Sequence, residues 1–124
     1  MVVGIALVDK PQGPTSHRIV GMARKALGLK KVGHAGTLDP MATGVLPVVF
    51  GEATKFSQYG LDADKAYAAT IQLGQATTTL DADGDATEER APISLDESCI
   101  RDVLTRLSGV ITQIPPLISA LKQD

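Results

Sequence analysis

The residues that could do chemistry gather in one loop, between residues 33 and 48. Asp39 stands in the middle of this loop, directly before Pro40, and three glycines surround it: Gly33, Gly36 and Gly44. Glycine allows backbone angles that other residues avoid, and proline fixes its own φ angle and restricts the residue before it. The sequence therefore predicts a rigid, tightly turned loop that holds one carboxylate in a defined direction.

The distribution of charge sets Asp39 apart from the other acids. Between residues 10 and 51 it is the single acid among six cations, which gives a net charge of +5, whereas residues 52–124 carry a net charge of −6. Nearby positive charge favours the ionised form of a carboxylate. A basic segment around one anionic group indicates a polyanionic substrate and an acid with a chemical role.

The spacing of apolar residues predicts a helix over residues 16–27, which positions several of these cations. Thr15 or Ser16 can cap its start, and Gly28 is a typical stop. The cations off its apolar side could be ordinary solvated residues. Because no acid lies among them, we predict instead a surface that contacts phosphates, made of Arg18, Arg24, Lys25, Lys30 and Lys31.

Three further residues each have an ordinary interpretation and a functional one. His34 could be a loop histidine bonded to backbone or, five residues before Asp39, could reach a ligand over the loop. Tyr67 is by default a core aromatic on a strand. In a chain with four aromatic residues it is also a platform for a nucleobase, since stacking contributes about 1–3 kcal/mol. Lys10 is either a solvated turn residue or a phosphate contact.

Apolar runs and alternation predict four strands, at residues 2–8, 45–50, 65–73 and 110–114. The first should be buried and the third half-buried. Pro47 indicates that the second strand lies at a sheet edge or contains a bulge.

The remaining elements follow from local signals. Residues 54–59 favour one or two helical turns, and residues 74–85 a polar loop. Ser94 and Glu97 have capping-box spacing and should open a helix that ends near Leu107. Its apolar face comprises Ile100, Val103, Leu104 and Leu107.

No metal or cofactor site is predicted. Asp81, Asp83 and Asp85 resemble the start of a calcium loop, but the glycine is misplaced and no glutamate stands at the twelfth position. The two histidines and Cys99 lack metal-ligand spacing. No Walker or dinucleotide-binding glycine pattern occurs, and no serine stands at a nucleophile elbow.

Composition bounds the class of protein. A chain of 124 residues with 44% apolar content is one small domain or part of a larger one. The single cysteine, Cys99, cannot form an intramolecular disulfide, which indicates a reducing compartment. No apolar run approaches the length of a membrane span. We therefore expect a soluble cytoplasmic protein.

Four stretches of the chain, in order, resemble the signatures of the TruB-type tRNA pseudouridine synthases. They are residues 10–16 (KPQGPTS), 33–47, 65–67 and 115–122. The second stretch is long and specific, and the short spacing favours the stand-alone tRNA enzymes over their guide-RNA-dependent relatives. The resemblance implies an α+β fold with a mixed, largely antiparallel sheet flanked by helices. It also implies conversion of the uridine at position 55, in the T loop of tRNA, to pseudouridine, without a cofactor.

The resemblance assigns roles to individual residues. Asp39 matches the catalytic aspartate, which either adds to the sugar or base as a nucleophile or supports an elimination at the ribose. The target base must leave the stack, which costs a few kcal/mol. His34 matches the histidine that accommodates the flipped nucleotide, and Tyr67 the tyrosine that stacks on the base. Lys10, grouped with them at the substrate site, matches a lysine that mainly supports the loop.

The family's catalytic domain continues beyond the segment that residues 115–122 resemble, with a later strand motif whose arginine pairs with the aspartate. A small C-terminal RNA-binding PUA domain commonly follows the catalytic domain, and this sequence contains neither. We therefore expect residues 1–124 to be the N-terminal portion of the catalytic domain, with an incomplete fold. An inactive RNA-binding fragment is the alternative function. The expected partner is the T-arm stem-loop of tRNA, with no membrane and no obligate protein partner, so that the chain acts as a monomer.

Overall fold

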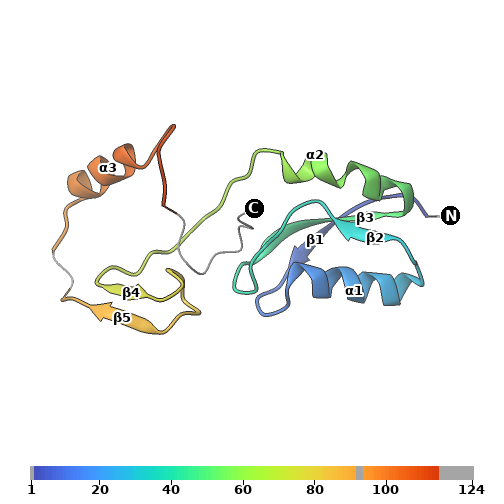
Figure 1. The fold of residues 1–124 in the computed structure, drawn as a ribbon, viewed down its shortest axis with the longest axis horizontal. Helices are drawn as coiled ribbons and strands as arrows, with labels where there is room; N and C mark the ends of the chain where they lie inside the picture. The colour runs from blue at the N-terminus through green and yellow to red at the C-terminus, as the bar shows by residue number, and fades with distance from the viewer. Residues whose placement is uncertain (1, 92–93, 115–124) are drawn as a thin grey trace. The chain divides into compact units, whose positions relative to one another are not determined.

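A computed structural model describes residues 2–91 and 94–114 (Figure 1). The chain divides into two compact units, Met1–Tyr67 and Ala68–Asp124. Both combine helices with antiparallel strands, which confirms the predicted α+β class. The segment 115–122, the last of the four stretches noted above, lies outside the described residues. Within the described part, no helix has both the length and the apolar character needed to cross a membrane.

The first unit contains a three-stranded antiparallel sheet in the order β1-β3-β2. β1 (Gly4–Lys10) pairs along its whole length with β3 (Gly44–Phe50), from Gly4 opposite Phe50 to Lys10 opposite Gly44. The short strand β2 (Val32–His34) pairs with the end of β3. β3 is therefore the central strand, and its first residue follows directly on the loop that carries Asp39.

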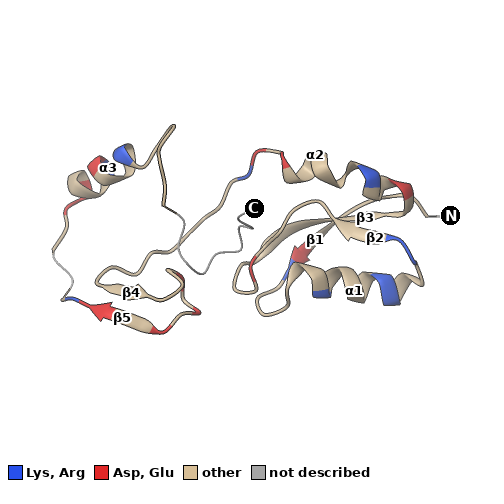
Figure 2. Cartoon of the chain, in the orientation of Figure 1, with Lys and Arg blue, Asp and Glu red and all other residues tan. Residues whose placement is uncertain are grey.

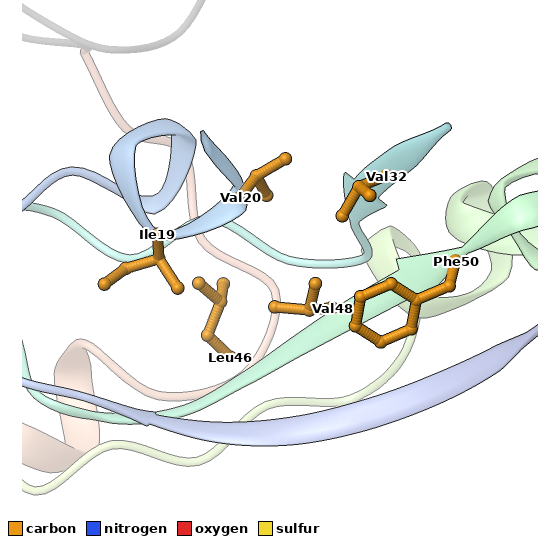
Figure 3. Packing of buried hydrophobic residues seen from close by; sticks show 6 residues of the cluster. All are labelled: Ile19, Val20, Val32, Leu46, Val48 and Phe50. Atoms are coloured by element: carbon orange, nitrogen blue, oxygen red, sulfur yellow. The ribbon is translucent and has the colours of Figure 1, made fainter. Parts of the chain in front are cut away.

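Helix α1 (Ser16–Leu27) covers one face of this sheet and has the predicted bounds. The Thr15 hydroxyl accepts a hydrogen bond from the Arg18 N–H, and Gly28 ends the helix in the left-handed conformation (φ 63°). Figure 3 shows the core between helix and sheet. Its buried residues are Ile19, Val20, Val32, Leu46, Val48 and Phe50.

The prediction that residues 2–8 form a buried strand is correct for the strand and wrong for the burial. Ala6 and Val8 pack against the core, whereas Ile5 and Leu7 are 63% and 73% exposed. Successive side chains of a strand point to opposite faces. α1 covers one face only, so the other face of β1 remains exposed within the described part of the chain.

The prediction that Pro47 marks an edge or a bulge is also wrong, because β3 is central and its register with β1 is regular. Pro47 lies opposite Leu7, and its carbonyl accepts a hydrogen bond of 2.9 Å from the Ala35 N–H. The N–H and C=O of one strand residue point to the same side. An N–H on residue 47 would therefore point away from β1, toward the side where β2 has already ended. The proline thus costs no hydrogen bond between β3 and β1.

Beyond β3 the chain forms a 3₁₀ helix, η1 (Gly51–Phe56), and a short helix, α2 (Ser57–Leu61), where helical turns were predicted. Figure 1 places them on the side of the sheet opposite α1. The Lys65 ammonium donates to the carbonyls of Leu61 (2.6 Å) and Ala63 (2.7 Å), close to the C-terminal end of α2.

The second unit differs more from the predictions. Strand β4 (Gln75–Thr77) lies within the predicted polar loop of residues 74–85 and forms a hairpin with β5 (Ala86–Glu89), which follows that loop. α3 (Glu97–Arg106) forms as expected, but its N-cap is Asp96, whose carboxylate accepts from the Cys99 N–H at 2.8 Å. The Ser94 capping box is therefore wrong. The apolar face of α3 is 42–61% exposed in the described structure.

Neither of the strands predicted over residues 65–73 and 110–114 forms. Alternating side chains define two faces, but a strand also needs a neighbour that supplies backbone hydrogen bonds. Among the described residues, no strand pairs with either segment.

Candidate active-site loop

The loop that carries Asp39 connects β2 with β3 and spans residues 35–43. His34 ends β2, and Gly44 opens β3 with a φ of 114°, a value that a residue with a side chain adopts only with strain. Asp39 is exposed. The described residues make no hydrogen bond or ion pair with its carboxylate, which leaves the group free to meet a substrate.

Lys10, the last residue of β1, holds the loop by hydrogen bonds from inside the protein. Its side chain is fully buried, and its ammonium donates to three backbone carbonyls: Pro11 (2.9 Å), Pro14 (2.9 Å) and Pro40 (3.2 Å). The surface interpretations, a solvated turn residue or a phosphate contact, are therefore wrong. The placement of Lys10 among substrate-binding residues does not fit this burial either. The geometry is that of a residue that supports the loop, because Pro40 follows Asp39 directly.

Ser16 forms hydrogen bonds with the loop at the residue before Asp39. Its hydroxyl donates to the Leu38 carbonyl and accepts from the Leu38 N–H, both at 2.9 Å. Its side chain is 3% exposed. The residues before and after Asp39 are thus each bonded to a buried side chain.

Backbone hydrogen bonds complete the frame of the loop. The Gly13 N–H donates to the Pro40 carbonyl (2.8 Å), and the Ala42 N–H donates to the Asp39 carbonyl (3.0 Å). A Cβ atom placed on Gly60 of α2 would lie 2.6 Å from the Ala35 Cβ, so α2 approaches the start of the loop as closely as glycine allows. These contacts agree with the predicted rigid, tightly turned loop.

His34 is half-buried at the beginning of the loop. Its Nδ1 atom is buried and has no hydrogen-bond partner among the described residues. Buried polar atoms are nearly always paired, so an unpaired ring nitrogen beside the loop marks a place where a further group is needed.

Tyr67 does not join the loop in the described structure. It follows α2 in a segment without regular secondary structure and is 65% exposed. The expectation of a core aromatic on a strand is therefore wrong. No hydrogen bond or ring contact of the described residues links Tyr67 with Asp39 or His34.

The predicted phosphate-contacting residues are all exposed and lie on α1 or directly after it (Figure 2). Arg24 also donates to the Val32 carbonyl at 3.3 Å, and Lys31 pairs with Glu52 at 2.8 Å. The other three, Arg18, Lys25 and Lys30, make no ion pair within the described ranges. These three side chains are therefore available to an external anion.

Glu52 lies in η1 and forms ion pairs with both Lys31 and Lys55. Hydrogen bonds and charge attraction from these two lysines lower the pKa of Glu52 from 4.5 to about 2. The same contact raises the pKa of Lys55. Glu52 thus holds Lys31 in place and partly neutralises it.

Sequence reasoning identified Ser16 only as a possible helix cap and missed its bonds to the loop. Its partner is 22 residues away, which no local pattern encodes. The available signal was a second hydroxyl residue directly after Thr15, which is sufficient as the cap. Among the described residues, no group of three or more His, Cys, Asp or Glu side chains could hold a metal ion.

Comparisons with known proteins point to one family. A family model described as TruB family pseudouridylate synthase, N-terminal domain, matches residues 24–124. A curated protein of Pseudomonas fluorescens (strain Pf0-1), named tRNA pseudouridine synthase B, is 54% identical over 123 residues, which are 99% of this chain and 40% of that protein. The protein of the same name from Azoarcus sp. (strain BH72) is 52% identical over 124 residues, all of this chain and 41% of the relative.

A solved structure, the crystal structure of a Cbf5-Nop10-Gar1 complex, is similar with a TM-score of 0.63 and 34% identity. The match covers 98% of this chain and 31% of that one. The chain therefore spans about two-fifths of the length of the curated relatives it matches, and a smaller share of the solved one.

Proposed function

The chain belongs to the TruB family of pseudouridylate synthases, and we propose that its loop converts uridine to pseudouridine in tRNA. The observation that carries this proposal is the frame around Asp39: an exposed carboxylate whose two neighbours in sequence are bonded to the buried side chains of Ser16 and Lys10. Such a frame holds a reactive group in a defined direction before substrate arrives, which is a large part of catalysis.

The reaction is an isomerisation that needs one well-placed acid. The N1–C1′ bond of the uridine breaks and a C5–C1′ bond forms, while C5 loses its proton and N1 gains one. Asp39 either adds to the sugar or base as a nucleophile or supports an elimination at the ribose. Both routes need its carboxylate beside the ribose and the base outside the stack.

We assign the supporting roles as follows. His34, whose Nδ1 has no hydrogen-bond partner in the described part of the chain, contacts the flipped nucleotide, and Tyr67 stacks on the target base. The exposed cations on and after α1 hold the phosphate backbone; they are Arg18, Arg24, Lys25, Lys30 and Lys31. The RNA segment is the T-arm stem-loop, and the target is the uridine at position 55. We place the reaction in the cytoplasm and expect the chain to act as a monomer.

We further propose that residues 1–124 correspond to the N-terminal portion of the catalytic domain of the longer relatives. The chain covers 40% of the protein from Pseudomonas fluorescens, and the matching family model describes an N-terminal domain. An inactive RNA-binding fragment is the second candidate function, favoured by the 65% exposure of Tyr67 and by the lack of any bond or ring contact between Tyr67 and Asp39 among the described residues.

A comparison of Asp39→Asn with the unchanged sequence separates the two functions, because an active enzyme forms pseudouridine only with the carboxylate present. The variant should form no pseudouridine in a T-arm stem-loop, because the amide can neither act as a nucleophile nor take up a proton as a carboxylate does. Its affinity for the stem-loop should be equal to that of the unchanged chain or slightly higher, since a negative charge is lost. Pseudouridine formation by Asp39→Asn would show that the role given to Asp39 is wrong.

A further inference from the structure

Ser16 makes two hydrogen bonds through a single atom to a single residue of the active-site loop. The Oγ atom donates to the Leu38 C=O and accepts from the Leu38 N–H, both at 2.9 Å. A serine hydroxyl is among the few side-chain groups that donate and accept at the same atom. It therefore pairs with Leu38 as a residue of a neighbouring strand would, and among the described residues no strand pairs with the loop at this point.

The Leu38 carbonyl belongs to the peptide group that Asp39 shares through its own N–H. A peptide group is planar and rigid, so a bond to the Leu38 carbonyl also fixes the orientation of the N–H and Cα atoms of Asp39. Lys10 and Gly13 hold the carbonyl of Pro40, two peptide groups further along. Asp39 is thus bonded through its neighbours on both sides, and its own side chain is left free.

The anchor at Ser16 is itself rigid. Ser16 is the first residue of α1, which Thr15 caps through the Arg18 N–H. One turn further along, Ile19 and Val20 are buried in the core against the sheet. A bond to Ser16 therefore connects the loop to the helix that packs on the sheet through this core.

Resting on the function proposed above, we propose that Ser16 is a positioning residue for Asp39. It acts through Leu38 and touches neither substrate nor the reacting atoms. Its hydroxyl keeps the Leu38–Asp39 peptide group in one orientation, and so limits the directions in which the carboxylate points. Loss of this hydroxyl should lower kcat for the stem-loop about 10- to 100-fold, with KM changed less than about threefold, because misplacement of a reacting group by about 1 Å has an effect of that order.

The decisive measurement is independent of turnover. We would record amide exchange at Leu38 and the backbone order parameter of Asp39 by NMR, for the unchanged chain and for Ser16→Ala. The variant should exchange the Leu38 amide at least about tenfold faster, and the order parameter of Asp39 should fall from about 0.85, typical of rigid backbone, to below about 0.6. Ser16→Cys, which keeps the size but donates only weakly, serves if the alanine variant does not fold.

Thr15→Ala is the matched control, because it removes the adjacent hydroxyl from the same turn. It should speed exchange of the Arg18 amide, because the Thr15 hydroxyl accepts a hydrogen bond from that N–H. It should also lower the stability of the protein, because the helix loses its N-cap. The Leu38 amide and the Asp39 order parameter should not change. If Thr15→Ala loosens Asp39 as much as Ser16→Ala, or if Ser16→Ala leaves Asp39 ordered, the positioning role is overturned.

Turnover then separates this inference from the proposed function. Absence of pseudouridine formation by the unchanged sequence, both as this chain and extended to the length of its relatives, would refute the function, whereas the NMR comparison would still decide whether Ser16 orders Asp39. Normal kcat in Ser16→Ala, with an active unchanged sequence, would refute the positioning role alone. A lower kcat with unchanged KM in Ser16→Ala but not in Thr15→Ala supports both.

Discussion

Replacement of Lys10 by methionine should destabilise the protein by about 3 kcal/mol. Methionine has nearly the same length and fills the same buried space, so the change removes the ammonium group and little else. That ammonium donates to the carbonyls of Pro11, Pro14 and Pro40 from a fully buried position. The cost depends on which of the three oxygens can find another donor.

The three carbonyls differ in this respect. Pro11 is exposed, so water can replace the lysine, and the Pro40 carbonyl keeps the Gly13 N–H at 2.8 Å. Pro14 is half-buried and loses its donor. A hydrogen bond to a charged group contributes about 1.5–3 kcal/mol, and an unpaired buried group costs about 1–3 kcal/mol. Methionine also removes the desolvation cost of a buried charge, and this gain offsets part of the sum. The net loss of stability is about 3 kcal/mol.

Urea unfolding followed by far-ultraviolet circular dichroism measures this loss. With a slope of about 1.5 kcal/mol/M, the midpoint should fall by about 2 M. Lys30→Met is the matched control, because Lys30 is exposed and makes no contact that the described residues show, so its change should stay within about 0.5 kcal/mol. Equal midpoints for the two variants would refute the claim that Lys10 supports the loop from inside.

Three further predictions follow from individual contacts. The carboxyl of Glu52 should titrate with a pKa of about 2 in an NMR experiment, and Lys31→Gln, but not Lys30→Gln, should raise that pKa toward 4.5. Since folding lowers this pKa, the stability that the cluster contributes is present above about pH 4.5 and is lost as the pH falls toward 2. Reversal of charge at Lys30 and Lys31 together should weaken stem-loop binding and reduce the slope of log K against log salt by about 2, measured by filter binding. Gly60→Ala should destabilise the protein by about 1–3 kcal/mol because its Cβ would meet Ala35, whereas Gly21→Ala, with open space around it, should stabilise α1 by about 0.5–1 kcal/mol.

Each of these predictions has a clear contrary result. A Glu52 midpoint that stays near 2 in Lys31→Gln would mean that the ion pair does not cause the pKa shift. The control is Arg101→Glu in α3, a residue outside the proposed RNA-contacting set. An unchanged salt slope after reversal at Lys30 and Lys31 would show that these lysines do not contact the RNA. Equal effects of alanine at Gly60 and Gly21 in thermal unfolding would contradict the close approach of α2 to the loop.

The sequence predicted helix α1 and the strand after the Asp39 loop correctly, because local signals and the fold agree there. Helix α1 has the expected bounds, since its apolar spacing lies within the helix and its cap and glycine stop lie directly beside it. The strand after the Asp39 loop formed as expected, although Pro47 proved compatible with a central strand once β2 ended beside it. The hydrogen bonds that frame the loop agree with the rigid turn that its glycines and Pro40 predict.

The sequence failed where partners are distant along the chain. Residues 65–73 alternate well but have no neighbouring strand in the described structure, so Tyr67 is exposed. The residues alone predicted Lys10 at the surface, because a lysine is buried only when acceptors converge on it, and such convergence has no local signature. The resemblance, by contrast, implied a lysine that supports the loop, and the buried geometry agrees with that role. The bonds of Ser16 to Leu38, 22 residues away, were missed for the same reason.

The most direct test of the central claim is release of tritium from C5 of the target uridine in a T-arm stem-loop. The assay would compare this chain, the same chain extended to the length of its curated relatives, and the Asp39→Asn variant of each. We predict release by the unchanged sequence in at least the extended form, and none by either Asp39→Asn variant. Release by an Asp39→Asn variant, or no release by either unchanged form while the stem-loop still binds, would contradict the claim that this loop isomerises uridine.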